Sequence, residues 1–220
     1  MRAAGWHRNA IGNLWEEIGL LQLDFLVAQG LQPHHQLLDI GCGALRGGVR
    51  LVPYLEPGNY CGVDASAELL AAGKRELELI GGQNRRPVLH QDDTFDLGWF
   101  GRRFDIVLAH SLFTHLNLNA ILLCVVAVSK VIRNDGRFFA TFFENPHRPY
   151  DLRVGSQSCC DGATFLTFPD SDPYHYDFDT LRGVCESVGM EATNLGDWGH
   201  PRSQKMMLLR TGDRTRSAGH

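Results

Sequence analysis

Several kinds of segment are missing from this sequence of 220 residues. No apolar run reaches the ~18 residues that a membrane-spanning helix needs. No dense run of Lys and Arg marks a surface for nucleic acid, and the formal net charge is −4. Residues 1–13 lack the charged-then-apolar order of a secretory signal peptide. These absences predict a cytoplasmic protein without a membrane partner, and they disfavour nucleic acid as a partner.

The cysteines also lack a familiar pattern. None of the six belongs to a Cys-x-x-Cys pair, the spacing typical of many metal and redox sites. Cys42, Cys61 and Cys124 lie within apolar stretches, where we expect buried, reduced thiols. We expect the adjacent Cys159 and Cys160 to be free thiols in a loop. The sequence predicts no metal site.

What is present has the composition of a globular protein, with 44% hydrophobic and 21% charged residues. Strand-like and helical patterns alternate along most of the chain. The predicted strands are 36–40, 60–63, 87–90, 104–109, 137–143, 190–195 and 205–209. The predicted helices are 11–29, 46–55, 66–79, 118–132 and 177–188. This alternation predicts an α/β fold with a doubly wound, mostly parallel sheet and helices on both faces.

The alternation stops at residues 144–176, which contain four prolines and few periodic apolar positions. Long irregular segments in compact domains are usually functional or disordered. The aromatic and His side chains of this segment would suit a small, partly apolar ligand. Residues 196–202, at the turn of the last predicted hairpin, have a similar composition. For both stretches the plainer interpretation is an ordinary surface loop.

Residues 37–43, Leu-Leu-Asp-Ile-Gly-Cys-Gly, form the most informative motif. An apolar run that ends in Gly41 and Gly43 predicts a buried strand and a tight loop whose backbone can approach a ligand closely. Asp64 ends a second apolar run, 60–63. A strand, Gly-x-Gly, a helix, a strand and an acid in this order are typical of a nucleoside cofactor site.

The third glycine of the dinucleotide fingerprint is missing. Gly-x-Gly-x-x-Gly would place it at position 46, where this chain has Arg46, and Gly47 comes one residue late. A long side chain there would crowd the helix N-terminus that a pyrophosphate needs. The loop therefore departs from the form that binds nicotinamide dinucleotides.

The motif 39–43, Asp64, Asp92 and the strand 104–109 together resemble the class I S-adenosylmethionine-dependent methyltransferases of the small-molecule type. The similarity extends over residues 36–143, and the closing hairpin after Gly189-Met190 is similar too. It implies a Rossmann-like sheet of seven strands, the last one antiparallel, with the cofactor at the carboxyl edge of the first four. On this basis we expect one domain over 1–210, divided into a helical cap (1–35), a cofactor-binding core (36–143), an acceptor or lid segment (144–176) and a closing helix and hairpin (177–210), with a polar tail (211–220).

The resemblance implies S-adenosylmethionine as the cofactor and assigns roles to individual residues. Gly41 and Gly43 would let the methionine part lie against the backbone. Asp39 would accept hydrogen bonds from the loop or the cofactor's ammonium group. Asp64 would accept both ribose hydroxyls, since a carboxylate has two acceptor oxygens, and Asp92 would bind the adenine amino group. The expected contacts are Asp39, Gly41, Cys42, Gly43, Asp64, Ala65, Asp92, Asp93 and His110.

Residues 110–115, His-Ser-Leu-Phe-Thr-His, follow the fourth predicted strand, where this family usually faces the methyl group. Methyl transfer is an in-line displacement that depends on alignment, and a general base helps when the nucleophile carries a proton. His110 and His115 are candidate bases because imidazole titrates near neutral pH. The plainer interpretation is that each one caps or orients the next helix. The prolines of nucleobase amino-methyltransferases are missing here, and no acidic cluster suggests a metal.

The sequence thus predicts an enzyme that transfers a methyl group from S-adenosylmethionine to an O, N or C atom of a small molecule. Three alternatives stay open. They are an NAD(P)-dependent oxidoreductase, a catalytically silent S-adenosylmethionine-binding protein, and a protein or RNA methyltransferase.

Overall fold

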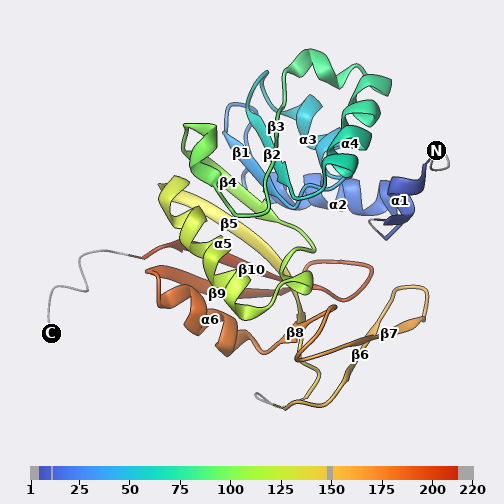
Figure 1. Cartoon of the computed structure of the whole chain (residues 1–220), viewed down its shortest axis with the longest axis vertical. Coiled ribbons are helices and arrows are strands. Elements are labelled where there is room, and N and C mark those ends of the chain that lie inside the picture. Colours follow the sequence, from blue (N-terminus) through green and yellow to red (C-terminus); the bar gives the residue numbers. More distant parts are fainter. Residues whose placement is uncertain (1–4, 11, 148–150, 213–220) are drawn as a thin grey trace, which may run out of the picture. The chain divides into compact units, whose positions relative to one another are not determined.

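The computed structural model of the chain describes residues 5–10, 12–147 and 151–212 (Figure 1). Its contacts group into two compact units, and the chain passes from the first to the second between Thr94 and Phe95. Most of the predicted tail, from residue 213 onward, lies outside the described residues. None of the described helices is long and apolar enough to cross a lipid bilayer. The predicted division into cap, core, lid and closing part stays a prediction.

The first unit is built on a parallel sheet of three strands. Its elements are α1 (Trp6–Ala10), α2 (Trp15–Ala28), β1 (Leu37–Ile40), α3 (Gly48–Tyr54), β2 (Tyr60–Asp64), α4 (Ala67–Leu79), the 3-10 turn η1 (Gly82–Arg85) and β3 (Val88–Gln91). β2 lies between β1 and β3, with Leu37 opposite Tyr60 and Cys61 opposite Val88. All residues of β1 are buried, as expected for a parallel strand covered by helices.

The first predicted helix, 11–29, begins four residues later in the structure, at Trp15, and a separate short helix, α1, precedes it. Gly12, Asn13 and Leu14 have φ angles of 86°, 55° and 50°. These are left-handed values, which a right-handed helix cannot continue through. α1 therefore ends before this turn, and α2 begins after it at Trp15.

The short helix α1 is attached to α4 through Glu76. The Glu76 carboxylate accepts a hydrogen bond from Arg8 Nη2 (2.9 Å), and its other oxygen lies 2.6 Å from His7 Nε2. The Arg8 guanidinium also lies over the Trp15 ring, 4.7 Å from its centroid. Charge-assisted hydrogen bonds of this kind hold a helix that is too short to be stable by itself.

The second unit contains the remaining strands. Its elements are the 3-10 turn η2 (Leu97–Phe100), β4 (Phe104–Ala109), the 3-10 turn η3 (Phe113–His115), α5 (Leu118–Val131), β5 (Ile132–Glu144), β6 (Gly155–Ser158), β7 (Thr164–Thr167), β8 (His175–Tyr176), α6 (Phe178–Glu186), β9 (Met190–Asp197) and β10 (Lys205–Thr211). β4 and β5 are parallel, and β10 lies between β5 and β9, antiparallel to both (Figure 1). The prediction of an antiparallel last strand is confirmed.

β5 begins five residues before the predicted strand, 137–143, and its first part contains an irregularity. Phe104 is opposite Ile132, whereas Ile106 is opposite Arg137. Residues 133–136 therefore lie outside the regular pairing with β4. The Asn-Asp-Gly sequence at 134–136 explains this, because these residues favour turns over strand interiors.

The segment 144–176, predicted to be irregular, contains a two-stranded hairpin. β6 and β7 are antiparallel, with Gly155 opposite Thr167 and Ser158 opposite Thr164. Gly162 turns the chain with a φ of 81°. Asp161-Gly162 is a sequence typical of hairpin turns, and it is the signal that the prediction missed. Further on, β8 pairs with the end of β5 in parallel.

The seven predicted strands are all present, three in the first unit and four in the second. Each lies within a few residues of its predicted bounds, and the strands of the first unit are connected through helices. The α/β fold class with a mostly parallel arrangement of these strands is therefore confirmed. Short strands β6, β7 and β8 are additions to it.

Candidate active site

The first unit contains a tight loop directly after β1, which we call the glycine loop (residues 41–47). Gly41 and Gly43 have φ angles of 70° and 55°, values that favour glycine. The N–H groups of Gly41 and Cys42 both donate to the carbonyl oxygen of Val63 (2.8 and 3.1 Å). The end of β2 therefore holds the start of the glycine loop.

Asp64, the last residue of β2, fixes the same loop with its side chain. Its Oδ2 accepts a hydrogen bond from the Gly43 N–H (2.7 Å), and its Oδ1 accepts one from the Ser66 N–H (2.8 Å). The side chain is half-buried. Since each carboxylate oxygen has two lone pairs, both oxygens keep capacity to accept a hydroxyl group of a ligand. A carboxylate with spare capacity on both oxygens can accept hydrogen bonds from two neighbouring hydroxyl groups.

Asp39 lies in β1 just before the glycine loop and is 3% exposed. The Tyr60 hydroxyl donates to its Oδ2 (2.7 Å). Burial raises the pKa of Asp39 to about 7, because desolvation disfavours the charged carboxylate more than the bond from Tyr60 favours it. The nearby charge of Asp64 raises the pKa further, and Arg46 lowers it. A cationic ligand near this carboxyl group would favour its ionised form.

Asp92 and Asp93 follow β3, and Asp92 is connected to Asp64. The Asp92 N–H donates to the Asp64 carbonyl oxygen (3.1 Å), and the Thr94 hydroxyl donates to Asp92 Oδ1 (2.6 Å). Asp92 is half-buried, and Asp93 is exposed. Hydrogen bonds thus connect Asp92 to Asp64 and Asp64 to Gly43. Three of the residues expected to bind the cofactor therefore lie close together.

Cys42 and Ala65 are the other residues of this unit that we expect to contact the cofactor. Cys42 is buried, and burial raises the pKa of its thiol, which keeps it neutral. Ala65 is exposed, and its carbonyl oxygen accepts a hydrogen bond from Gln91 Nε2 (3.3 Å). Both could contact a ligand only through small apolar or backbone groups.

Arg46 occupies the place of the third glycine and is 7% exposed. Its Nη1 donates to the Asn13 carbonyl oxygen in the left-handed turn between α1 and α2 (2.8 Å). The guanidinium therefore holds the turn that precedes α2. This contact gives Arg46 a structural role that a glycine could not have.

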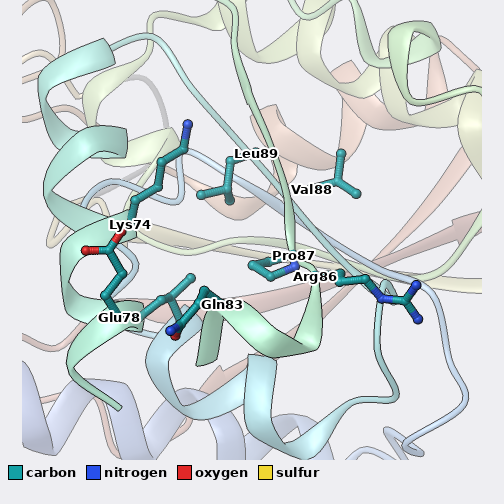
Figure 2. A pocket seen from close by; sticks show the side chains of 8 residues that line it. Lys74, Glu78, Gln83, Arg86, Pro87, Val88 and Leu89 are labelled. Atoms are coloured by element: carbon teal, nitrogen blue, oxygen red, sulfur yellow. The ribbon is translucent and has the colours of Figure 1, made fainter. Parts of the chain in front are cut away.

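A cavity of about 460 Å³ also lies in the first unit, between α4 and β3 (Figure 2). Figure 2 shows Lys74, Glu78 and Arg86 at its sides, and Leu77, Gln83 and residues 87–89 complete the lining. None of the expected cofactor residues lines it. This cavity is therefore distinct from the predicted site.

In the second unit, His110 follows β4 and lies among aromatic rings. It is 8% exposed. Its ring centroid is 5.8 Å from that of Trp198 and 5.2 Å from that of His200. The turn between β9 and β10 therefore contacts this candidate base. A functional role for residues 196–202 stays a prediction.

Ser111, the next residue, has a strained backbone with a φ of 55°. Its N–H donates to Thr141 Oγ1 (2.7 Å), and the Thr141 hydroxyl donates to Gln204 Oε1 (2.6 Å). Gln204 Nε2 in turn donates to Ser111 Oγ (3.0 Å). This closed network fixes the turn after β4. No sequence signal linked these three residues, because they belong to different elements.

His115 has a different environment. It lies in η3, and its Nδ1 is 2.6 Å from Asp172 Oδ1. The side chains of His115 and Asp172 are 57% and 56% exposed. Exposed ion pairs contribute little to stability, but a carboxylate can orient an imidazole. The two candidate bases thus differ, since one is buried among rings and the other is exposed beside an acid.

Among the residues that the structure describes, no group of three or more His, Cys, Asp or Glu side chains is arranged to hold a metal ion.

Comparison with known protein families matches residues 38–138, just under half of the chain, to a family described as "Methyltransferase domain". The matched range begins in β1 and ends in β5. It includes the glycine loop, Asp64, Asp92 and His110. The sequence match therefore covers most of the predicted cofactor-binding core.

Several solved structures are similar over most of the chain. A S-adenosylmethionine-dependent methyltransferase from Clostridium acetobutylicum ATCC 824 is 15% identical, with a TM-score of 0.66, over 93% of this chain and 94% of that one. Magnesium protoporphyrin IX methyltransferase from Synechocystis PCC 6803, with bound S-adenosylhomocysteine, is 16% identical, with a TM-score of 0.63, over 89% and 85%. An amino pentose methyltransferase from Micromonospora echinaspora, with bound S-adenosylmethionine, is 16% identical, with a TM-score of 0.64, over 96% and 97%. At these identities the likeness shows the fold.

The order of motifs, the matched domain and the fold agree with one another. Residues 38–138 therefore match a methyltransferase domain, and the chain has the fold of the class I S-adenosylmethionine-dependent methyltransferases.

Proposed function

We propose that this protein is an enzyme that transfers a methyl group from S-adenosylmethionine to an O, N or C atom of a small molecule. The observation that carries the proposal is the link between Asp64 at the end of β2 and Gly43 in the glycine loop. It places a carboxylate with spare acceptor capacity beside a loop of left-handed glycines.

The residues of the first unit fit this cofactor. Asp64 would accept the ribose hydroxyls, and Asp92, with Asp93 beside it, would bind the adenine amino group. Gly41, Cys42 and Gly43 would contact the methionine part, and Ala65 and His110 complete the proposed contacts. Asp39 would be stabilised in its ionised form by the positive charge of the cofactor. The cofactor supplies an electrophilic methyl group on a cationic sulfur.

The acceptor side of the reaction is proposed to involve the residues that follow β4. His110, buried beside Trp198 and His200, suits contact with a partly apolar acceptor. As a base, His110 would take the proton of a hydroxyl or ammonium group. His115 is the second candidate, because Asp172 orients its ring through Nδ1.

A small molecule is the favoured acceptor for two reasons. Similar structures include a magnesium protoporphyrin IX methyltransferase and an amino pentose methyltransferase. This chain also has a net charge of −4 and no dense basic run, which disfavours nucleic acid. We also propose a cytoplasmic location, because all six cysteines are free thiols.

Calorimetric titration with S-adenosylhomocysteine and, separately, with NAD tests the cofactor. We expect heat of binding with S-adenosylhomocysteine and none with NAD. Binding of NAD without binding of S-adenosylhomocysteine would favour the oxidoreductase alternative and contradict the proposal.

Methyl-labelled S-adenosylmethionine then tests the acceptor. The protein is incubated with small-molecule extracts, with protein and with RNA, and the label in each fraction is counted. We expect label in a small molecule. Label in protein or RNA would identify the macromolecular alternative, and cofactor binding without any transfer would identify a silent binder.

A further inference from the structure

Leu45 is the unusual residue of the glycine loop. Its φ is 64°, and its side chain is completely buried. A left-handed backbone is rare for a bulky residue, since the Cβ atom comes too close to the carbonyl oxygen. Such a conformation persists only where the surrounding structure holds it. The contacts of Leu45 show what holds it.

Two glycines on neighbouring helices make room for Leu45. A Cβ atom at Gly73 in α4 would lie 2.6 Å from Leu45 Cγ and 3.0 Å from the carbonyl atoms of Ala44. A Cβ atom at Gly48 in α3 would lie 2.8 Å from Leu45 Cβ. Carbon atoms do not approach so closely without displacement. Gly48 and Gly73 therefore form a socket for Leu45, which we call the loop socket.

The loop socket is continuous with the groups proposed to bind the cofactor. A Cβ atom at Gly48 would also lie 2.9 Å from the Tyr60 hydroxyl, which donates to Asp39. Two residues before Leu45, the Gly43 N–H donates to Asp64. The glycine loop is thus held by a polar contact at Gly43 and by an apolar contact at Leu45.

We propose that Leu45, seated in the loop socket, is a positioning residue that holds the glycine loop in the conformation that receives the cofactor. The proposal rests on the proposed function and extends it to residues that do not touch the ligand. A loop that already has its binding conformation loses less entropy when the ligand binds. The affinity for the cofactor therefore depends on the fit between Leu45 and the two glycines.

Calorimetric titration with S-adenosylhomocysteine tests this with Gly73→Ala, Leu45→Ala and the double variant. We expect Gly73→Ala to weaken binding at least about tenfold, because the new methyl group displaces Leu45 and Ala44. Leu45→Ala should also weaken binding, since the loop loses its anchor. The double variant should bind better than Gly73→Ala alone, because the clash with Leu45 Cγ is gone.

Gly183→Ala is the matched control. Gly183 lies in α6, and a Cβ atom there meets nothing within 4 Å. This variant should bind as the unchanged protein does. Melting curves confirm that each variant is folded at the titration temperature. If Gly73→Ala does not fold, the test rests on Leu45→Ala. Its affinity for S-adenosylhomocysteine and the amide NMR signals of Gly41 and Gly43 are then compared with those of the unchanged protein.

These titrations distinguish failure of the proposed function from failure of the inference about Leu45. If the unchanged protein does not bind S-adenosylhomocysteine, the proposed function fails. If it binds, and Leu45→Ala and Gly73→Ala bind equally well despite lower melting temperatures, Leu45 serves stability only and the inference is wrong.

Discussion

At the scale of single residues, the buried carboxyl group of Asp39 couples the stability of the fold to pH. Burial is the main cause of its pKa of about 7, against an ordinary value of 3.8. Between these two values the folded protein keeps a proton on Asp39 that the unfolded chain has released. Its contribution to stability is therefore complete below the lower value and is lost as the pH rises through the upper one.

Replacing Asp39 by Asn should remove this pH dependence, because the amide does not titrate and its oxygen can still accept from Tyr60. Between about pH 4.5 and about pH 7.5, the free energy of unfolding of the unchanged protein should fall relative to the variant by about 3 kcal/mol. Urea unfolding at several pH values measures the difference. Asp93→Asn, at an exposed acid, is the control and should follow the unchanged protein. Parallel curves for Asp39→Asn would show that Asp39 is already ionised.

Asp64 is the residue with the largest expected effect on cofactor binding. Asp64→Ala removes the acceptor for the Gly43 and Ser66 N–H groups and, by the proposal, for both ribose hydroxyls. The affinity for S-adenosylhomocysteine should fall by roughly 2–3 kcal/mol, since buried donors are left unpaired. Titration calorimetry measures it. Glu17→Ala, at an exposed acid of α2, should leave the affinity unchanged, and equal affinities for Asp64→Ala and the unchanged protein would show that the ribose assignment is wrong.

At the scale of elements, the hairpin of β9 and β10 contacts the residues that follow β4, besides closing the sheet of the second unit. Its turn holds Trp198 and His200 against His110. Gln204, just before β10, completes the network that fixes Ser111. The indole N–H of Trp198 donates to the Gln204 carbonyl oxygen (3.0 Å), which ties the turn to the strand.

Trp198→Leu tests this contact. The NMR signals of the His110 ring should move, because the ring current of the indole is lost, and the free energy of unfolding should fall by about 1–3 kcal/mol. Proton–carbon correlation spectra and urea unfolding measure the two effects. Trp99, which is 52% exposed and packs against Phe100, provides the control. Trp99→Leu should leave the His110 signals in place, and the same result for Trp198→Leu would contradict the contact.

At the scale of the whole molecule, the cysteines report how completely the chain is folded. All six are free, and four of them are buried: Cys42, Cys61, Cys124 and Cys185. Burial raises the pKa of these thiols where a shift is seen, to about 12 for Cys185. Neutral, buried thiols react slowly, because the thiolate is the nucleophile.

A thiol reagent such as dithiobisnitrobenzoate should therefore react in stages. Cys160 is exposed and should react first, followed more slowly by the half-buried Cys159. The four buried thiols should react only at the rate of unfolding. Cys160→Ser should remove the fast phase alone. Rapid reaction of all the thiols without denaturant would contradict the burial that the structure shows.

Much of the framework could be predicted from local pattern. The seven strands, the left-handed glycines after β1, and the acids at the end of β2 and after β3 follow from apolar periodicity and from the backbone freedom of glycine. Errors arose where a local signal was overlooked or was absent. Asp161-Gly162 predicts the hairpin of β6 and β7, and Gly12-Asn13 is a turn signal inside the predicted helix 11–29. No local signal predicts the left-handed conformation of Leu14.

By itself, the sequence determined the fold class and the position of the candidate cofactor residues, because these depend on neighbours in the chain. Only the tertiary structure decided which distant residues meet. The seat of Leu45 between Gly48 and Gly73 and the ring contacts of His110 with Trp198 and His200 depend on how closely helices and strands pack. The two candidate bases were equivalent in sequence, and their burial separates them. Packing is set by the sum of many contacts across the chain, which no local pattern contains.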